Sequence, residues 1–214
     1  SIEQLRKGNR TGFIPTAPGT AAERYVETVK MAEIVSALIA AGDTRIAEDI
    51  LLGSPNSIYR ITNGGQLPLA NFYEIDTATP FRSQPEFNSS YPATVTFESQ
   101  VSMANTALLL WRATGNEYAR ELAVNLVKGA MKEFYPALEN DKTRNIGAFS
   151  QLRYEQSILN GRLQSKPEVY EVRANAKMYL LLNSMEAVLG NSPETAVLRA
   201  EMNTKKAALK QWFI

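Results

Sequence analysis

Two apolar runs at helical spacing, separated by one glycine, constrain this chain more than any other feature. Apolar side chains recur every three or four positions from Val101 to Trp111, and again from Tyr118 to Phe134. Gly115 can take the left-handed conformation that ends a helix, and the Asn116 side chain can cap the helix that follows. We therefore predict a tight antiparallel helix pair within residues 97–134, with both apolar faces buried.

The corner of glycine followed by Asp or Asn occurs twice more, at Gly42-Asp43 and Gly190-Asn191. The three glycines are 73 and 75 residues apart, so the corners are either an internal repeat or the chemistry that any helical hairpin favours. Five further helices are predicted. The first runs from the capping box Thr20–Glu23 to about Ala41, a shorter one ends at about Gly53, and a third ends at Gly161. The fourth runs from the capping box Ser165–Glu168 to Gly190, and the last begins at Ser192-Pro193.

Between the predicted helices, residues 57–75 have a different pattern. Ile58–Thr62 and Leu67–Ile75 are rich in β-branched and aromatic residues, and Asn63-Gly64-Gly65 between them favours a hairpin turn. Residues 77–96 form a long loop that includes Phe81, Phe87 and Tyr91, aromatics that either pin the loop to its own domain or contact a neighbouring subunit.

The predicted fold class is mainly α: a bundle of antiparallel helix pairs with an inserted β-hairpin and long irregular arms. The chain divides into an N-terminal arm (1–19), a helical domain (20–200) with the insertion at about 57–96, and a C-terminal tail (201–214). The tail is basic at Lys205, Lys206 and Lys210 and ends in Trp212-Phe213-Ile214. These three apolar residues are either a lid on the chain's own core or an anchor on a neighbour.

Composition excludes several functional classes. The chain is 44% hydrophobic and 21% charged, which is typical of a globular protein, and its net charge of +1 creates no strong field toward nucleic acid or an anionic membrane. Cysteine and histidine are both absent, which rules out disulfides, thiolate or histidine metal sites and the Ser-His-Asp triad. The sequence contains no run of 18 consecutive apolar residues, the length that would suggest a membrane span. We predict no cofactor and no metal.

Motifs that carry chemistry are equally scarce. The sequence has no phosphate-binding loop, no dinucleotide fingerprint and no nucleophile elbow. Glu74, Asp76 and Glu98 lie in or beside the irregular region, where two carboxylates at a suitable separation can hydrolyse a glycoside. Their alternative interpretation is solvated surface charge. The basic residues near both ends can likewise meet nucleic acid or an acidic protein, or simply remain in solvent.

The order of the predicted elements resembles the head-to-tail adaptor proteins of tailed bacteriophages, over about residues 20–135. That resemblance implies a non-enzymatic virion subunit, assembled in the host cytoplasm, that forms a ring with its own copies and binds a portal or tail component. It also implies a hairpin that faces neighbouring subunits or the tail, and a C-terminal arm that binds the portal. The expected intersubunit contacts are Ile58, Tyr59, Asn63, Gly64, Phe72, Tyr73, Phe81, Phe87, Tyr91, Lys205, Lys206, Lys210, Trp212, Phe213 and Ile214. The long helical stretch 148–200 departs from the family pattern.

A second resemblance concerns the corner Leu110–Asn116, which is similar to hairpin corners of (α/α)-toroid carbohydrate-active enzymes. It implies an unusual or truncated enzyme that uses the three carboxylates named above. Full toroids are longer than this chain, and their sites commonly include histidine. The structural role is therefore the main hypothesis, and the enzyme is the alternative.

Overall fold

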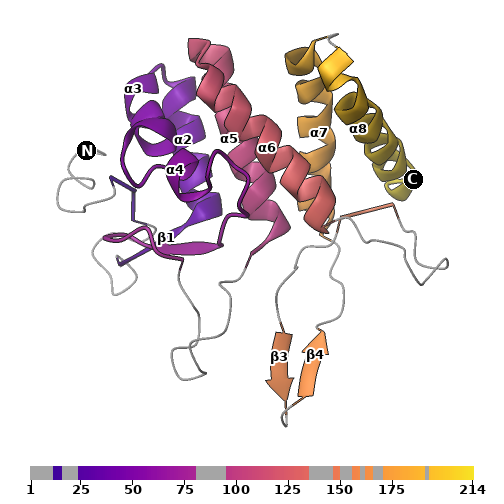
Figure 1. Ribbon diagram of the computed structural model, residues 1–214, viewed down its shortest axis with the longest axis horizontal. Helices are drawn as coiled ribbons and strands as arrows, with labels where there is room; N and C mark the ends of the chain where they lie inside the picture. Colours follow the sequence, from indigo (N-terminus) through magenta and orange to yellow (C-terminus); the bar gives the residue numbers. More distant parts are fainter. Residues whose placement is uncertain are drawn as a thin grey trace.

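Helix α5 (Phe97–Thr114) lies at the centre of the fold, and helices from both halves of the chain pack against it (Figure 1). The computed structural model describes residues 12–15, 24–80, 95–134, 147–149, 156–159, 162–165, 171–190 and 193–214. The other elements are β1 (Tyr25–Glu27), α2 (Thr28–Ala40), α3 (Thr44–Glu48), the π-helical turn η2 (Asp49–Gly53), α4 (Ile58–Ile61), β2 (Phe72–Glu74), α6 (Glu117–Phe134), β3 (Gln156–Leu159), β4 (Arg162–Ser165), α7 (Val172–Leu189) and α8 (Pro193–Trp212).

The predicted helix pair is confirmed as α5 and α6. Gly115 has φ +73°, and its N–H donates to the Trp111 carbonyl at 2.7 Å. Asn116 Oδ1 accepts from the Tyr118 N–H at 3.1 Å, so the asparagine caps α6 as expected. The mainly α fold class is also confirmed. Gly42 and Gly190 have positive φ as well, but Asp43 makes no side-chain capping bond to α3.

The first long helix begins later than the sequence suggests. Tyr25–Glu27 form strand β1, which pairs antiparallel with β2 so that Val26 faces Tyr73. Helix α2 therefore starts at Thr28, whose hydroxyl donates to the Ala70 carbonyl at 2.6 Å. The predicted capping box at 20–23 lies outside the described residues. Burial decides the outcome here, because Val26 and Tyr73 become part of the core through this pairing.

The hairpin predicted at Ile58–Ile75 is wrong in its first arm and its turn. Ile58–Ile61 form helix α4, and in the second arm only Phe72–Glu74 are strand, paired with β1. Asn63, Gly64 and Gly65 all have positive φ, as a hairpin turn would require, but here they end α4. The Thr62 hydroxyl accepts from the Gly65 N–H at 2.9 Å. The isoleucines of Ile-Tyr-Arg-Ile are three residues apart, which places them on one face of a helix but on opposite faces of a strand.

A hairpin does occur, at a place where the sequence analysis predicts a helix ending at Gly161. Strands β3 and β4 pair antiparallel with Leu159 facing Arg162, so only residues 160 and 161 connect them. Figure 1 shows this hairpin lying apart from the helices. Ser165 belongs to β4, so it does not open the next helix, which begins at Val172. Pro193 is the first residue of α8 as predicted, and α8 continues through the basic tail to Trp212.

Two buried amide side chains hold irregular segments against the helices. Gln100 on α5 accepts from the Leu69 N–H at 3.0 Å and donates to the Leu69 carbonyl at 2.7 Å. Asn175 on α7 accepts from the Phe149 N–H at 2.7 Å and donates to the Phe149 carbonyl at 3.0 Å. Each amide thus satisfies both polar groups of one buried residue. The Phe149 ring stacks on Phe97 with a centroid separation of 4.9 Å.

We predict that Asn175→Ala lowers the free energy of unfolding by about 3 kcal/mol, because the buried N–H and carbonyl of Phe149 both lose their partner. Asn183→Ala, on the exposed side of the same helix, is the matched control and is expected to change stability by less than about 0.5 kcal/mol. Urea unfolding followed by circular dichroism measures both. Equal losses for the two variants would show that the hydrogen bonds of Asn175 contribute nothing specific to stability.

Candidate functional site

A polar groove over α5 is the most site-like feature of the described residues. Helices α2 and α7 both pack on α5, and between them lies a groove of about 370 Å³. Its lining combines hydroxyl, amide and charged side chains with a few apolar ones: Ala32, Glu33 and Ser36 from α2, Val101, Ser102, Asn105 and Thr106 from α5, and Arg173, Lys177 and Leu180 from α7.

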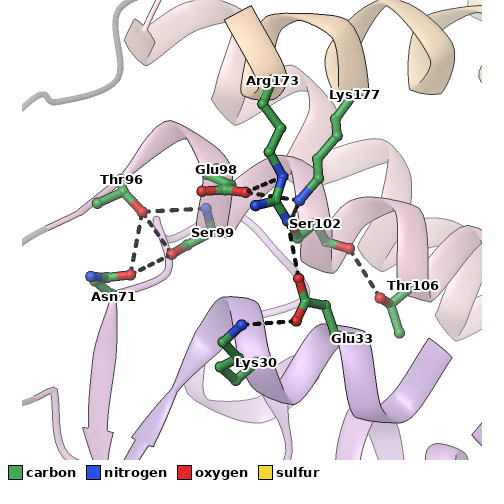
Figure 2. Close-up of polar contacts among 10 residues, drawn as sticks. All are labelled: Lys30, Glu33, Asn71, Thr96, Glu98, Ser99, Ser102, Thr106, Arg173 and Lys177. Atoms are coloured by element: carbon green, nitrogen blue, oxygen red, sulfur yellow. Dashed lines mark hydrogen bonds and ion pairs between the residues drawn. The ribbon is translucent and has the colours of Figure 1, made fainter. Parts of the chain in front are cut away.

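Charged side chains form a continuous chain of ion pairs beside this groove (Figure 2). Lys177 Nζ lies 2.8 Å from a Glu98 carboxylate oxygen, and Arg173 Nε lies 3.7 Å from the same oxygen. Arg173 also reaches Glu33 at 3.3 Å, and Glu33 pairs with Lys30 at 3.2 Å. We call these five residues the ion chain. It connects α2, α5 and α7, which are distant in sequence.

The hydrogen bonds within the groove indicate a structural arrangement. Lys177 donates to Ser102 Oγ at 3.4 Å and also to Glu98. A lysine acting as a base would have to accept the proton of that hydroxyl, whereas here the lysine donates to it. Ser36 and Thr106 share a hydrogen bond of 2.8 Å. The groove therefore presents paired charges and satisfied hydroxyls. None of these contacts activates a nucleophile.

A second cavity, of about 250 Å³, lies between the turn after α4 and helix α6. Gly65 belongs to its wall, with φ +85°, and a Cβ there would lie 3.0 Å from the Leu122 carbonyl oxygen. Lys128, Lys132 and Glu133 contribute charge at this cavity. The close approach of Gly65 to α6 shows that the predicted flap is packed against the helical body.

The structure places most of the contact residues predicted in the hairpin segment inside the chain's own fold. Ile58 and Gly64 are buried, Phe72 is half-buried, and Asn63 alone is exposed. Tyr59 donates to Glu121 at 2.8 Å and meets the Tyr118 ring edge-on, and the bond to Glu121 raises the pKa of Tyr59. Phe81, Phe87 and Tyr91 lie outside the described residues.

Tyr73 is buried as well, and its hydroxyl accepts from the Ala70 N–H at 2.9 Å. Burial raises the pKa of Tyr73 from its ordinary value of 10.0 to about 12. The phenol therefore belongs to the core.

We predict that stability falls by about 2.7 kcal/mol in all through Tyr73 as the pH rises from well below 10 to well above 12, because the unfolded chain releases this proton earlier than the folded one. Below pH 10 the contribution is fully present. Other groups titrate in this range, so the measurement is the difference in unfolding free energy between wild type and Tyr73→Phe at pH 9 and 11. The stability of wild type relative to Tyr73→Phe should be lower at pH 11 than at pH 9. A constant difference would contradict the buried, neutral phenol.

The C-terminal residues divide between core and surface. Leu209 is buried and Trp212 packs partly buried against the core, so the lid interpretation holds as far as Trp212. Lys206 pairs with Glu186, burial lowers the pKa of Lys205, and Lys210 is exposed. Phe213 contacts the Trp212 ring but is 41% exposed, and Ile214 is 98% exposed. Of the three apolar residues that end the chain, Phe213 and Ile214 are the exposed ones, so they remain available as an anchor.

The three candidate catalytic carboxylates do not share a cavity. Glu74 on β2 accepts from Thr77, Asp76 is exposed in the turn that follows, and Glu98 is in the ion chain. None of the three lines either cavity. Within the described part of the chain, no group of three or more Asp and Glu residues is arranged to hold a metal ion. Among the described helices, none combines the length and apolar character of a membrane span.

Comparison with protein families, curated proteins and solved structures finds no match to this chain. Sequence reasoning also missed the groove, although a signal was present. Arg173 and Lys177 are four residues apart and so share one face of a helix. Their carboxylate partners lie 75 or more residues earlier, at Glu98 and Glu33, and the sequence does not indicate which helices meet.

We predict a coupling free energy of about 1 kcal/mol between Glu98 and Lys177, measured with Glu98→Gln, Lys177→Met and the double variant. The Glu98 side chain is only 15% exposed, so water screens this pair weakly. The exposed pair Glu117–Arg120, which lies outside the ion chain, is the control, with an expected coupling of about 0.3 kcal/mol. Unfolding in urea at low and high salt gives both values. Equal couplings would mean that the ion chain does not hold the helices together.

Proposed function

We propose that this chain is a non-enzymatic structural subunit of a multi-copy assembly, of the kind formed by head-to-tail adaptors of tailed bacteriophages. In this proposal it forms a ring with copies of itself and binds a portal or tail component. The observation that carries the proposal is the β3–β4 hairpin, which lies apart from the helical body (Figure 1).

The hairpin is a two-stranded sheet, and no other described strand pairs with either of its outer edges. A two-stranded hairpin standing alone is at best marginally stable in water. At the outer edge of a sheet, where no further strand pairs, backbone N–H and carbonyl groups can pair readily with a strand of another chain. A contact with a neighbouring subunit would satisfy these groups and stabilise the hairpin, which supports a role inside an assembly.

This observation changes the segment to which the partner-facing role is assigned. The resemblance to adaptors places a hairpin before the central helix pair, at Ile58–Ile75, but that segment packs on the chain's own core. We therefore assign the role to Gln156–Ser165, after the pair. The two exposed C-terminal residues, Phe213 and Ile214, support a second contact at the other end of the chain.

The test begins with sedimentation of the native source, with mass spectrometry to find this chain and electron microscopy to image its fraction. We expect the chain in fast-sedimenting particles. Its presence only as a free chain in the slow fraction would overturn the proposal and redirect the search to carbohydrate cleavage.

A hairpin variant gives an independent prediction. Replacing residues 156–165 with a Gly-Ser linker of equal length should leave the helical circular dichroism unchanged and abolish incorporation into particles. The control is Asp76→Asn, an exposed change on another part of the surface, which should incorporate like wild type. Normal incorporation of the linker variant would remove the hairpin from the contact.

A further inference from the structure

The cavity of about 250 Å³ between the turn after α4 and helix α6, which we call the α6 cavity, combines buried apolar residues with exposed charged ones. Leu126 and Phe134 line it and are buried in the core. Lys128 and Lys132 line it as well and are exposed. Apolar walls with a few polar groups are the usual composition of a small-molecule site, where the polar groups orient the ligand.

Gly129 leaves space in the middle of the α6 wall. It lies inside α6, one turn after Asn125 and one turn before Glu133, and all three residues line the cavity. A Cβ on Gly129 would meet no neighbouring atom within 4 Å, whereas on the other wall a Cβ on Gly65 would lie 3.0 Å from a carbonyl oxygen. Glycine disfavours a helix interior relative to alanine. The packing of the described chain thus explains Gly65 but does not explain Gly129.

The charges at the α6 cavity favour an anion. Its lining carries two lysines and one glutamate, which is a net charge of +1. Lys132 Nζ lies 4.0 Å from a Glu133 carboxylate oxygen, and Lys128 makes no ion pair with any residue that the structure describes. The two lysines are four residues apart on one face of α6, where like charges slightly disfavour the helix. An anion bound near both ammonium groups would relieve this repulsion.

The walls of the cavity are held in place by hydrogen bonds within the chain. Gln100 binds both backbone polar groups of Leu69, and the Asn125 amide donates to the Gly64 carbonyl at 2.8 Å. These bonds join the segment after α4 to α5 and α6 without any ligand. A site whose walls are already fixed loses little freedom when a ligand binds.

We propose that the α6 cavity binds a small organic carboxylate. The carboxylate group lies at the ammonium groups of Lys128 and Lys132, and the apolar body lies over Gly129 against Leu126 and Phe134. The volume limits the ligand, because a cavity of about 150 Å³ holds one benzene molecule. About 250 Å³ therefore suits a phenyl or short alkyl group with one carboxylate. The site is remote in sequence from the β3–β4 hairpin, and it does not rest on the proposed assembly role.

Titration with benzoate, followed through the amide signals of α6 in two-dimensional NMR, tests the site. We expect the Gly129 signal to shift saturably, with a dissociation constant at or below about 1 mM. Benzyl alcohol has the ring without the charge and inorganic phosphate has charge without a ring, so each should bind at least about tenfold more weakly. If neither benzoate nor hexanoate shifts these signals, the proposal is overturned, and phosphate binding as tightly as benzoate would overturn the apolar part of the site.

Lysine variants test the charged part. The double variant Lys128→Met, Lys132→Met keeps most of each apolar stem, and it should raise the benzoate dissociation constant at least about tenfold. The matched control is Lys210→Met, an exposed lysine of α8, which should leave the constant unchanged. Circular dichroism checks that both proteins are folded. Unchanged benzoate affinity in the double variant would overturn the site.

Gly129→Ala tests the space, because stability and binding are expected to move in opposite directions. Alanine favours the helix, so the urea midpoint of unfolding should rise. Its Cβ occupies space at the cavity, so the benzoate dissociation constant should rise at least about threefold. A higher midpoint with unchanged affinity would show that the ligand does not lie over Gly129. A lower midpoint would show that the glycine serves the chain's own packing, which would remove it from the argument for a site.

Discussion

The fold depends on backbone groups of irregular segments being satisfied by side chains of the central helices. Gln100 and Asn175 each bind the N–H and carbonyl of one residue, Leu69 and Phe149, much as a neighbouring strand would. Without these amides, two buried extended segments would carry unpaired polar groups, which is costly away from water. The helices therefore supply both the apolar surface of the core and the hydrogen bonds that allow non-helical chain to enter it.

The sequence predicted those elements whose signals are local. Gly115 and Asn116 define the α5–α6 corner by backbone freedom and capping, and neither needs information from elsewhere in the chain. The Ile58 segment has the β-branched and aromatic composition of a strand, which is why a hairpin arm is predicted there, but Ile58 and Ile61 share one face of a helix and Ile58 is buried in the core in that form. Asn160-Gly161, between β3 and β4, is a strong hairpin signal, and it outweighs the apolar residues at helical spacing that predict a helix there.

The candidate site was less predictable than the fold because it is made by long-range packing. The ion chain brings together α2, α5 and α7, and each of its residues alone resembles ordinary surface charge. The 63% exposure of Arg173 against 15% for Glu98 shows that the network runs from solvent into the interface between helices. The ion chain adds a polar link between three helices that also share buried apolar residues of the core.

Gly147 gives the hairpin a mechanical connection to the rest of the molecule. At φ +72°, a Cβ on this residue would lie only 2.8 Å from the Ala208 carbonyl oxygen of α8, and two residues later Asn175 of α7 holds Phe149. Phe149 precedes the first hairpin residue, Gln156, by seven positions. A pull on the hairpin from its N-terminal strand would therefore be carried first by this short segment, and it would reach α7 and α8 together. Under such a pull, α7 and α8 would bear the tension as one unit.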